Sequence, residues 1–311
     1  MKSLNQHLKD YLALRRGLGF KLRLADCLLR QFIRFAKDNR ASRVTTDLAV
    51  NWATQPTTAQ PATWADRYRT LRLFAKYVIT VDARSEVPPT GLLSQRRHRK
   101  SPYLYTDEEV VAVIRTASKL PSPKRLRGTS LSTFFGLLAA TGMRVGEAVA
   151  LDRAHVALSE GLLTIHHPKG GRTRLVPIHA STCLALQRYQ RLRNRICPQP
   201  NSPSFFLTEQ GARFSTTTIR SWFARVSRLT GLRGPADQRG PRLHDLRHRF
   251  AIQALLRWYR AGQDAEVHMP ELATYLGHRH VSGTYWYLSA TPVLLQEATR
   301  RWRRGKGGQK L

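Results

Sequence analysis

Residues 141–147 read Thr141-Gly142-Met143-Arg144-Val145-Gly146-Glu147, and this stretch separates two helical patterns. Apolar residues predict a helix over 131–140, which the threonine–glycine pair ends, and a further helix is indicated over 147–151. Arg144 therefore lies at a break between helices. In a basic protein an arginine is most often a solvated or phosphate-positioning side chain, and Glu147, three residues on, can simply pair with it on a helix surface.

The residues on both sides of this stretch predict a mainly helical domain with one small sheet. Thr106 and Glu109 have the spacing of a capping box at a helix start. Two apolar runs, 162–167 and 173–178, are typical of strands, and the glycine-containing segment 168–172 between them predicts a hairpin loop. Further helices are predicted over 181–195, 216–229, 244–260, 270–276 and 290–303. We expect this α+β domain to span 106–311.

The first 90 residues predict a separate helical bundle. Apolar residues recur at helical spacing over 4–14 and 24–35, Thr46-Asp47 can cap a short helix through Trp52, and a fourth helix is predicted over 64–81. Basic residues lie between the apolar ones in this part of the chain. A basic interdomain linker is predicted over 91–105, because prolines and a glycine break regular structure there before a run of basic residues.

The charge balance points to a polyanionic partner. The 311 residues include 52 Lys and Arg against 20 Asp and Glu, a formal net charge of +32. Nucleic acid is the expected partner, with an anionic membrane surface as the lesser alternative. Cys27, Cys183 and Cys197 have neither a disulfide-framework nor a metal-binding spacing, as is typical of reduced thiols in a cytoplasmic protein. No apolar run approaches the roughly 20 residues of a membrane helix.

Six positions in the second half form an ordered set of chemically active side chains. They are Arg144, Lys169, His244, Arg247, His278 and Tyr287. His244 and Arg247 form a His-x-x-Arg motif, and His278 ends a Leu-Gly-His motif nine residues before Tyr287. Each motif alone occurs by chance in basic proteins, but the ordered set with a lysine hairpin before it is specific. The set resembles the tyrosine recombinases, a family of phage and transposon integrases and Xer resolvases.

The resemblance covers residues 106–299 closely and the first domain more loosely. It implies a helical, SAM-like core-binding domain over 1–90 and an α+β tyrosine recombinase catalytic domain. It also implies a 3′-phosphotyrosyl intermediate with a free 5′ hydroxyl, no metal and no cofactor. The two domains of such proteins clamp DNA from opposite faces. In relatives a C-terminal segment docks on the neighbouring protomer, and we expect residues 292–303 to do so here, with 292–311 forming the C-terminal segment.

The six residues also make chemical sense by themselves. Cutting and rejoining DNA without an energy source requires a covalent intermediate that stores the bond energy, and the phenolic oxygen of Tyr287 suits that role. Arg144 and Arg247 would hold the non-bridging phosphate oxygens, and Lys169 would protonate the departing 5′ oxygen. His244 and His278 would assist removal of the tyrosine proton or bond a phosphate oxygen.

Several alternatives remain open beside this interpretation. Tyr285 rivals Tyr287, but residues two apart on a helix point about 200° apart, and the spacing from His278 selects Tyr287. Lys169 also fits ordinary hairpin chemistry, with Arg172 and Arg174 close by. His244 and His248 have the i, i+4 spacing of zinc pairs, but the segment is not His-Glu-x-x-His, so we expect no metal.

The expected partners are double-stranded DNA sites and further copies of the chain. We expect a tetrameric synapse on DNA and a monomer or weak dimer in its absence, with partner recombinases and accessory DNA-bending proteins left open. A mobile-element integrase is the leading subclass and a housekeeping Xer resolvase the second. A type IB topoisomerase and a non-catalytic DNA-binding protein are the alternatives. The predicted DNA-binding residues are Arg67, Arg69, Arg72, Arg96, Arg97, Arg99, Lys100, Arg172 and Arg174.

Overall fold

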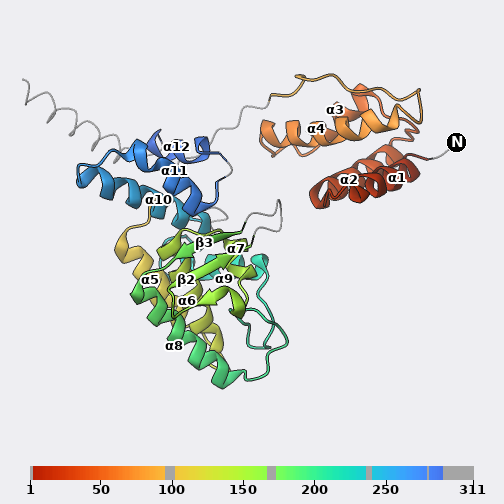
Figure 1. The fold of residues 1–311 in the computed structure, drawn as a ribbon. Helices are drawn as coiled ribbons and strands as arrows, with labels where there is room; N and C mark the ends of the chain where they lie inside the picture. Colours follow the sequence, from red (N-terminus) through yellow and green to blue (C-terminus); the bar gives the residue numbers. More distant parts are fainter. Residues whose placement is uncertain (1–2, 95–101, 167–172, 236–239, 279, 290–311) are drawn as a thin grey trace, which may run out of the picture. The chain divides into compact units, whose positions relative to one another are not determined.

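The structure is a computed structural model that describes residues 3–94, 102–166, 173–235, 240–278 and 280–289. Its contacts divide the chain into two compact units, Met1–Lys100 and Ser101–Leu311 (Figure 1). The predicted helix over 290–303 and the C-terminal segment 292–311 lie outside the described residues, as does most of the basic run in the predicted linker. The fold class, mainly helical with a small sheet, is confirmed.

The first unit is a helical bundle made of α1 (Leu4–Gly17), α2 (Arg23–Asp38), α3 (Thr46–Thr54) and α4 (Pro61–Val78). Its core contains Leu8, Phe32, Trp52, Leu71 and Phe74, all nearly inaccessible to solvent. These side chains come from all four helices, so each helix turns its apolar stripe inward, as the periodicity predicts.

Two helix starts in this unit differ from the prediction. Thr45, and not the predicted Thr46-Asp47 pair, caps α3, because the Thr45 side chain accepts a hydrogen bond from the backbone of Leu48 at 3.2 Å. The fourth helix begins at Pro61 rather than at residue 64, since proline at the first helical position has the required φ and lacks only an N–H that would be unpaired anyway.

The second unit begins with α5 (Asp107–Ser118), α6 (Leu126–Thr141) and α7 (Val145–Ala150). The predicted capping box at the start of α5 is confirmed: Thr106 and Glu109 bond each other's backbone N–H groups. Both α6 and α7 start earlier than predicted, at residues 126 and 145 instead of 131 and 147. The polar residues in the first turns of α6 hid its beginning from the apolar periodicity.

One antiparallel sheet in the described part of this unit has the order β1 (Val156–Ala157), β2 (Leu162–Ile165) and β3 (Arg174–Pro177). A short 3-10 helix, Arg153–His155, precedes it. Leu163 pairs with Val176, and both side chains point into the core. The hairpin β2–β3 was predicted, whereas β1 was not, because two residues give no readable alternation.

Five further helices complete the described part of the second unit. They are α8 (Ala180–Ile196), α9 (Thr216–Leu229), α10 (Leu243–Arg260), α11 (Ala265–Leu276) and α12 (Ser282–Ser289). The α11 helix starts at Ala265, not at Pro270, because Asp264 caps it and Pro270 lies in an early turn where it removes a single ladder bond.

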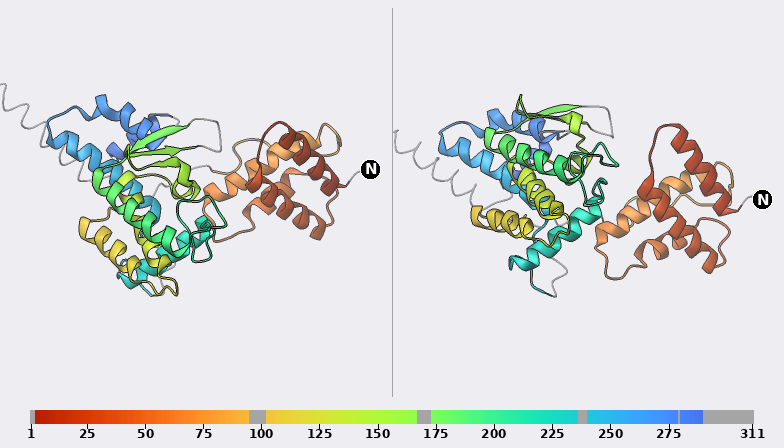
Figure 2. Two further views of the ribbon diagram at one scale, coloured as in Figure 1. Left: turned by 60° about the horizontal axis from the view of Figure 1, so that its bottom comes forward. Right: turned by 90° about the horizontal axis from the view of Figure 1, so that it is seen from below.

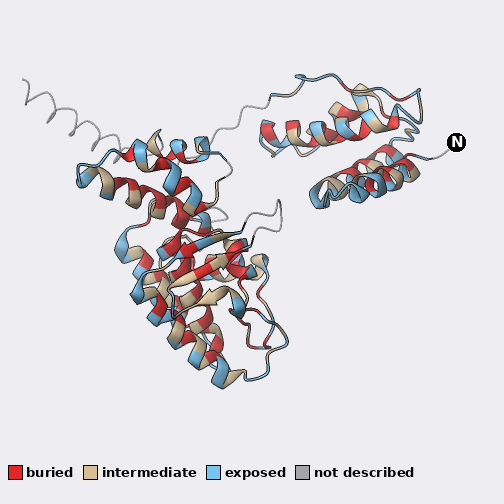
Figure 3. Ribbon diagram, viewed as in Figure 1, coloured by how far each residue is buried: buried red, intermediate tan, exposed pale blue. Residues whose placement is uncertain are grey.

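The second unit has two apolar cores. The larger one lies among α5, α6, α8, α9 and the sheet, and the smaller one holds α10, α11 and α12 together. In Figures 1 and 2 the helices α10–α12 form a group of their own beside β3 and α7, and Figure 3 shows the buried faces that line these contacts. No helix among the described residues is long and apolar enough to cross a membrane.

Candidate active site

The structure brings five of the six predicted catalytic residues to one place, where α7, α10, α11 and α12 meet. Arg144 caps the start of α7, His244 and Arg247 lie in the first turns of α10, His278 follows α11, and Tyr287 is in α12. Lys169 is outside the described residues, together with Arg96, Arg97, Arg99, Lys100 and Arg172. The assignment of these side chains to catalysis or DNA binding stays a prediction.

The Arg247 side chain is buried and fixed by two backbone carbonyls. Its guanidinium donates to the carbonyl of Gly142 at 2.9 Å and to that of Leu276 at 2.7 Å. Only 2% of Arg247 is exposed, and burial together with the charge of Arg144 lowers its pKa to about 10. Arg247 is thus a cation held in advance, at the junction of the ends of α6 and α11.

Gly142 explains why the decisive stretch contains glycine at the end of α6. It has φ +61°, in the left-handed region, and an added Cβ would come within 2.7 Å of the Phe250 ring. Phe250 in turn stacks on Tyr275 of α11, with ring centroids 5.4 Å apart. The missing side chain therefore lets α10 pack against the end of α6, and it leaves the Gly142 carbonyl facing Arg247.

Replacing Gly142 with alanine is expected to destabilise the second unit by about 1–3 kcal/mol, because the new methyl group meets Phe250 and the backbone remains left-handed. Calorimetric unfolding of the variant and the wild type measures this. Gly146→Ala is the matched control, since no atom lies within 4 Å of a Cβ there. Equal unfolding midpoints for Gly142→Ala and Gly146→Ala would contradict the packing argument.

Glu147 is a buried carboxylate that holds Arg144. It accepts from the Arg144 guanidinium at 2.7 Å and from the Arg144 backbone N–H at 2.9 Å. A second arginine, Arg174 of β3, donates to both Glu147 oxygens, at 3.2 and 2.8 Å. Burial alone would raise the pKa of Glu147, but the bonds from Arg174 and Arg144 outweigh it and hold the pKa at about 2. The pairing of Glu147 with Arg144, left open by the sequence, is therefore observed, inside the protein and not on its surface.

The site histidines are held in the neutral form. Nδ1 of His278 lies 2.6 Å from the hydroxyl of the buried Thr284. Burial and the nearby Arg247 lower the pKa of His278 to about 4. Partial desolvation at the rim of the site, together with Arg247, also lowers the pKa of His244, whose ring is reached by solvent. Neutral imidazoles can accept a proton, which a base in this site must do.

Tyr287 is the buried tyrosine of α12, and Tyr285 is the exposed one. Tyr287 is 2% exposed and Tyr285 43%, as the opposite directions of residues two apart on a helix require. Burial raises the pKa of Tyr287, while the charge of Arg247, a hydrogen bond from it and the charge of Arg144 act against that rise. The Tyr287 ring is 6.2 Å from that of His278 and nearly parallel to it.

His248 belongs to this site, although the sequence assigned it only to a helix face or the core. Its ring lies edge-on to both His244, at 4.7 Å, and Tyr287, at 5.5 Å. Burial and His244 lower its pKa to about 4. The i, i+4 spacing from His244 was the available signal. Among the described residues, no three His, Cys, Asp or Glu side chains converge as metal ligands would.

Acid is expected to destabilise the second unit in two steps. The pKa of His248 and His278 is about 4 in the folded state against 6.5 in an unfolded chain, so the unfolded state binds more protons and stability falls from about pH 6.5 to pH 4. Glu147, with a pKa of about 2 against 4.5, adds a further loss below about pH 4.5. Unfolding midpoints measured across this range test the expectation, and His248→Gln should flatten the first step only. A midpoint that stays constant down to about pH 4.5 would contradict it.

The predicted DNA-binding residues of the first unit differ in their surroundings. Arg67 is buried: it lies over the Trp52 ring and donates to the Trp52 carbonyl at 2.9 Å. Arg72 donates to the carbonyl of Pro88 at 2.8 Å, while Arg69 is largely exposed and pairs with Asp66. Of the three, Arg69 is the most accessible to a DNA backbone. Their roles remain predictions.

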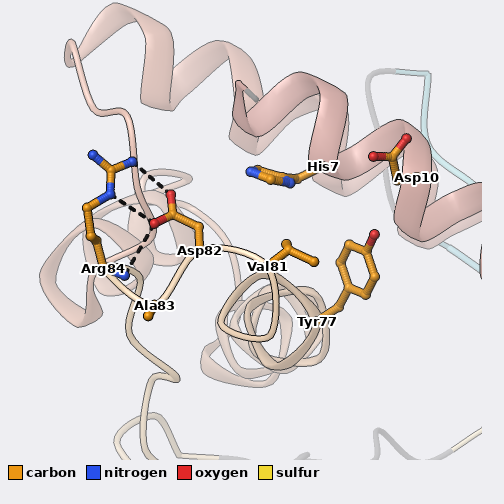
Figure 4. Close-up of a pocket in the computed structure, with 7 residues that line it drawn as sticks. All are labelled: His7, Asp10, Tyr77, Val81, Asp82, Ala83 and Arg84. Atoms are coloured by element: carbon orange, nitrogen blue, oxygen red, sulfur yellow. Dashed lines mark hydrogen bonds and ion pairs between the residues drawn. The ribbon is translucent and has the colours of Figure 1, made fainter. Parts of the chain in front are cut away.

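A hollow in the first unit lies apart from these residues, between α1 and the end of α4 (Figure 4). His7, Asp10 and Tyr77 line it, together with Asp82 and Arg84. Two hydrogen bonds of 2.9 Å join the Arg84 guanidinium to the Asp82 carboxylate, and they lower the pKa of Asp82 to about 2. None of the predicted catalytic or DNA-binding residues lines this hollow, so we assign it no part in the site.

Comparison with known proteins gives a consistent result. The sequence profile of the phage integrase family matches residues 104–292. Protein y4rB of Sinorhizobium fredii (strain NBRC 101917 / NGR234), named as a candidate integrase/recombinase, is 44% identical over 98% of both chains.

Two solved structures share the fold. The Tn1549 transposon integrase in complex with transposon right end DNA matches with a TM-score of 0.67 at 15% identity, over 97% of this chain and 100% of that chain. A lambda integrase tetramer bound to a Holliday junction matches with a TM-score of 0.58 at 16% identity, over 90% and 78%. The family profile and the long, 44% identical relative therefore show that the chain belongs to the phage integrase family, the tyrosine recombinases.

Proposed function

We propose that this site-specific recombinase cuts and rejoins double-stranded DNA through a covalent link between Tyr287 and a 3′ phosphate. The observation that carries the proposal is the position of Tyr287, buried within reach of Arg247 and beside the His278 ring. A tyrosine that only packed in a core would not need two arginines and three histidines around it.

The reaction is a transesterification at phosphorus. The Tyr287 oxygen attacks the scissile phosphate, a new bond between phosphorus and that oxygen forms, and the bond to the 5′ oxygen breaks. The tyrosine proton passes to a neutral histidine, with His278 and His244 as the candidates, and Lys169 gives a proton to the departing 5′ oxygen. Attack by a 5′ hydroxyl reverses each step and releases Tyr287, so no energy source is needed.

Arg144 and Arg247 stabilise the negative charge that grows on the non-bridging oxygens. Both guanidiniums are held by backbone carbonyls and so do not have to be reorganised during the reaction. Arg144 is the more exposed of the two, with 37% of its side chain accessible, and thus faces the side from which DNA must approach. Removal of one such preorganised donor commonly slows a reaction about 10²- to 10³-fold.

A nicked DNA substrate that carries the recombination site tests the proposal. Cleavage near the nick lets the short 5′ fragment diffuse away, so the covalent adduct accumulates and survives denaturation. Without an adduct from the wild-type protein the proposal would be wrong. Relaxation of any supercoiled plasmid without exchange between two sites would instead indicate a topoisomerase.

Lys169 is expected to act as the general acid, and a modified substrate isolates that role. Lys169→Ala should slow cleavage of ordinary DNA about 10²- to 10⁴-fold, the usual contribution of general acid catalysis. If sulfur replaces the 5′ bridging oxygen, the leaving thiolate needs no proton, and the variant should cleave about as fast as the wild type. A defect of equal size on both substrates would contradict the assignment.

The finer functional assignments rest on the same family. We propose that the chain integrates or excises a mobile element, since a transposon integrase shares its fold, and that four copies assemble on paired sites, as in the lambda integrase tetramer. Residues 292–303 are proposed to dock on the neighbouring protomer, and deletion of 292–311 should then abolish synapsis while single-site binding persists. We further propose that the protein acts in the cytoplasm on nucleoid DNA.

A further inference from the structure

Three consecutive carbonyls at the end of α11 accept hydrogen bonds from three arginines of three different elements. Tyr275 accepts from Nε of Arg174 at 2.9 Å, Leu276 accepts from Arg247 at 2.7 Å, and Gly277 accepts from Arg144 at 2.9 Å. The last carbonyls of a helix lack partners within the helix and carry partial negative charge, so cations at this end are stabilising. His278 follows directly, so these contacts also fix where its ring begins.

Arg174 is the one of the three arginines that the proposed chemistry does not use. It is on β3, with 10% of its side chain exposed, and it connects two parts of the site. Besides the Tyr275 carbonyl it holds both oxygens of Glu147, the carboxylate that orients Arg144. A single guanidinium thus links the strand that returns from the lysine hairpin, the acid beneath Arg144 and the end of α11.

We propose that Arg174 is a positioning residue for strand cleavage: it fixes Glu147, and through it Arg144, relative to the end of α11 and to β3. The inference rests on the proposed function, because the step that it supports is attack at the scissile phosphate. It replaces the sequence-based assignment of Arg174 to DNA binding, since three of its N–H groups are directed to protein acceptors.

The geometry explains why a lysine would not serve in this position. A guanidinium presents a flat fork that reaches a carboxylate with two N–H groups and a carbonyl with a third, whereas an ammonium group is a point charge on a flexible chain. Arg174→Lys should therefore keep the charge and lose much of the alignment. A displacement of about 1 Å in a catalytic group can cost roughly 10²-fold in rate.

The test compares cleavage with DNA binding in the full-length protein. Single-turnover cleavage of the nicked substrate by Arg174→Gln is expected to fall about 10- to 100-fold, with Arg174→Lys in between, while the dissociation constant for the same DNA changes less than about threefold. Arg127→Gln is the matched control. Arg127 also joins a buried carboxylate, Glu209, and a carbonyl, that of Pro121, each at 2.7 Å, and it has no contact with the site elements α10–α12 in the described structure.

A double-mutant cycle separates positioning from general loss of stability. If Arg174 acts through Glu147, the combined variant Arg174→Gln, Glu147→Gln should be little slower than the slower single variant. Arg127→Gln and Glu147→Gln should instead add. Thermal unfolding of each variant shows whether it remains folded at the assay temperature, and Arg174→Lys supplies the comparison if Arg174→Gln does not.

The pH profile provides a readout that a purely structural role would not move. Glu147 faces Arg144 and Arg174 directly and Arg247 at longer range. Without Arg174 the burial of Glu147 raises its pKa, so cleavage by Arg174→Gln should decline toward acidic pH at a higher pH than in the wild type. Glu147→Gln, which cannot titrate, should show no such shift.

Three results would overturn the inference while leaving the proposed function intact. The first is wild-type cleavage by Arg174→Gln. The second is a loss of rate that adds to that of Glu147→Gln. The third is a loss confined to DNA affinity, with the salt dependence reduced by about one phosphate contact, which would make Arg174 a DNA-binding residue. Failure of the wild-type protein to form any adduct would overturn the proposed function itself.

Discussion

Tyr287→Phe is expected to abolish the covalent adduct and strand exchange, with a loss in cleavage rate of at least about 10⁴-fold, because no other group can form the ester bond. Affinity for the DNA site should change little, since most of the binding energy of so basic a protein comes from phosphate contacts elsewhere. The measurement is adduct formation on the nicked substrate beside equilibrium binding to the intact site.

Tyr285→Phe is the matched control, because it makes the same change two residues earlier in α12, on an exposed side chain. It should cleave DNA about as fast as the wild type. If the adduct persists in Tyr287→Phe and disappears in Tyr285→Phe, the nucleophile is Tyr285 and the buried position of Tyr287 has another purpose.

Arg247→Ala is expected to damage both catalysis and folding. The rate of cleavage should fall by at least about 10²- to 10³-fold, because a fixed donor to the phosphate is lost. The free energy of unfolding of the second unit should fall by about 2–5 kcal/mol, because the Gly142 and Leu276 carbonyls lose their partner and a cavity replaces the buried side chain.

Arg144→Ala provides the contrast. Its catalytic loss should be of similar size, but the free energy of unfolding should fall by only about 1 kcal/mol, since 37% of the Arg144 side chain is exposed and Glu147 keeps Arg174 as a partner. Calorimetry and single-turnover cleavage on the same preparations measure both quantities. Equal losses of stability in Arg144→Ala and Arg247→Ala would contradict the difference in burial that the structure records.

Much of the fold was readable because its signals are local. The capping box of Thr106 and Glu109 spans four residues, and the helix 216–229 was predicted with its observed bounds. The errors occurred where a local signal has two meanings. Pro270 was read as a helix start although it lies inside α11, and the start of α6 carries too few apolar residues to be recognised.

The sequence by itself determined the family and the identity of the chemical groups, because the ordered motifs around Arg144, Arg247, His278 and Tyr287 are specific as a set. It could not determine what those groups touch. The partners of Arg174 lie 27 and 101 residues away along the chain, and those of Arg247 lie 105 and 29 away.

Only the tertiary structure decided that Arg174 holds Glu147 and the end of α11, that His248 lies against Tyr287, and that Tyr287 rather than Tyr285 is buried. The physical reason is that caps and apolar periodicity act within a few residues. The direction and burial of a guanidinium or a phenol depend instead on which distant elements pack around it.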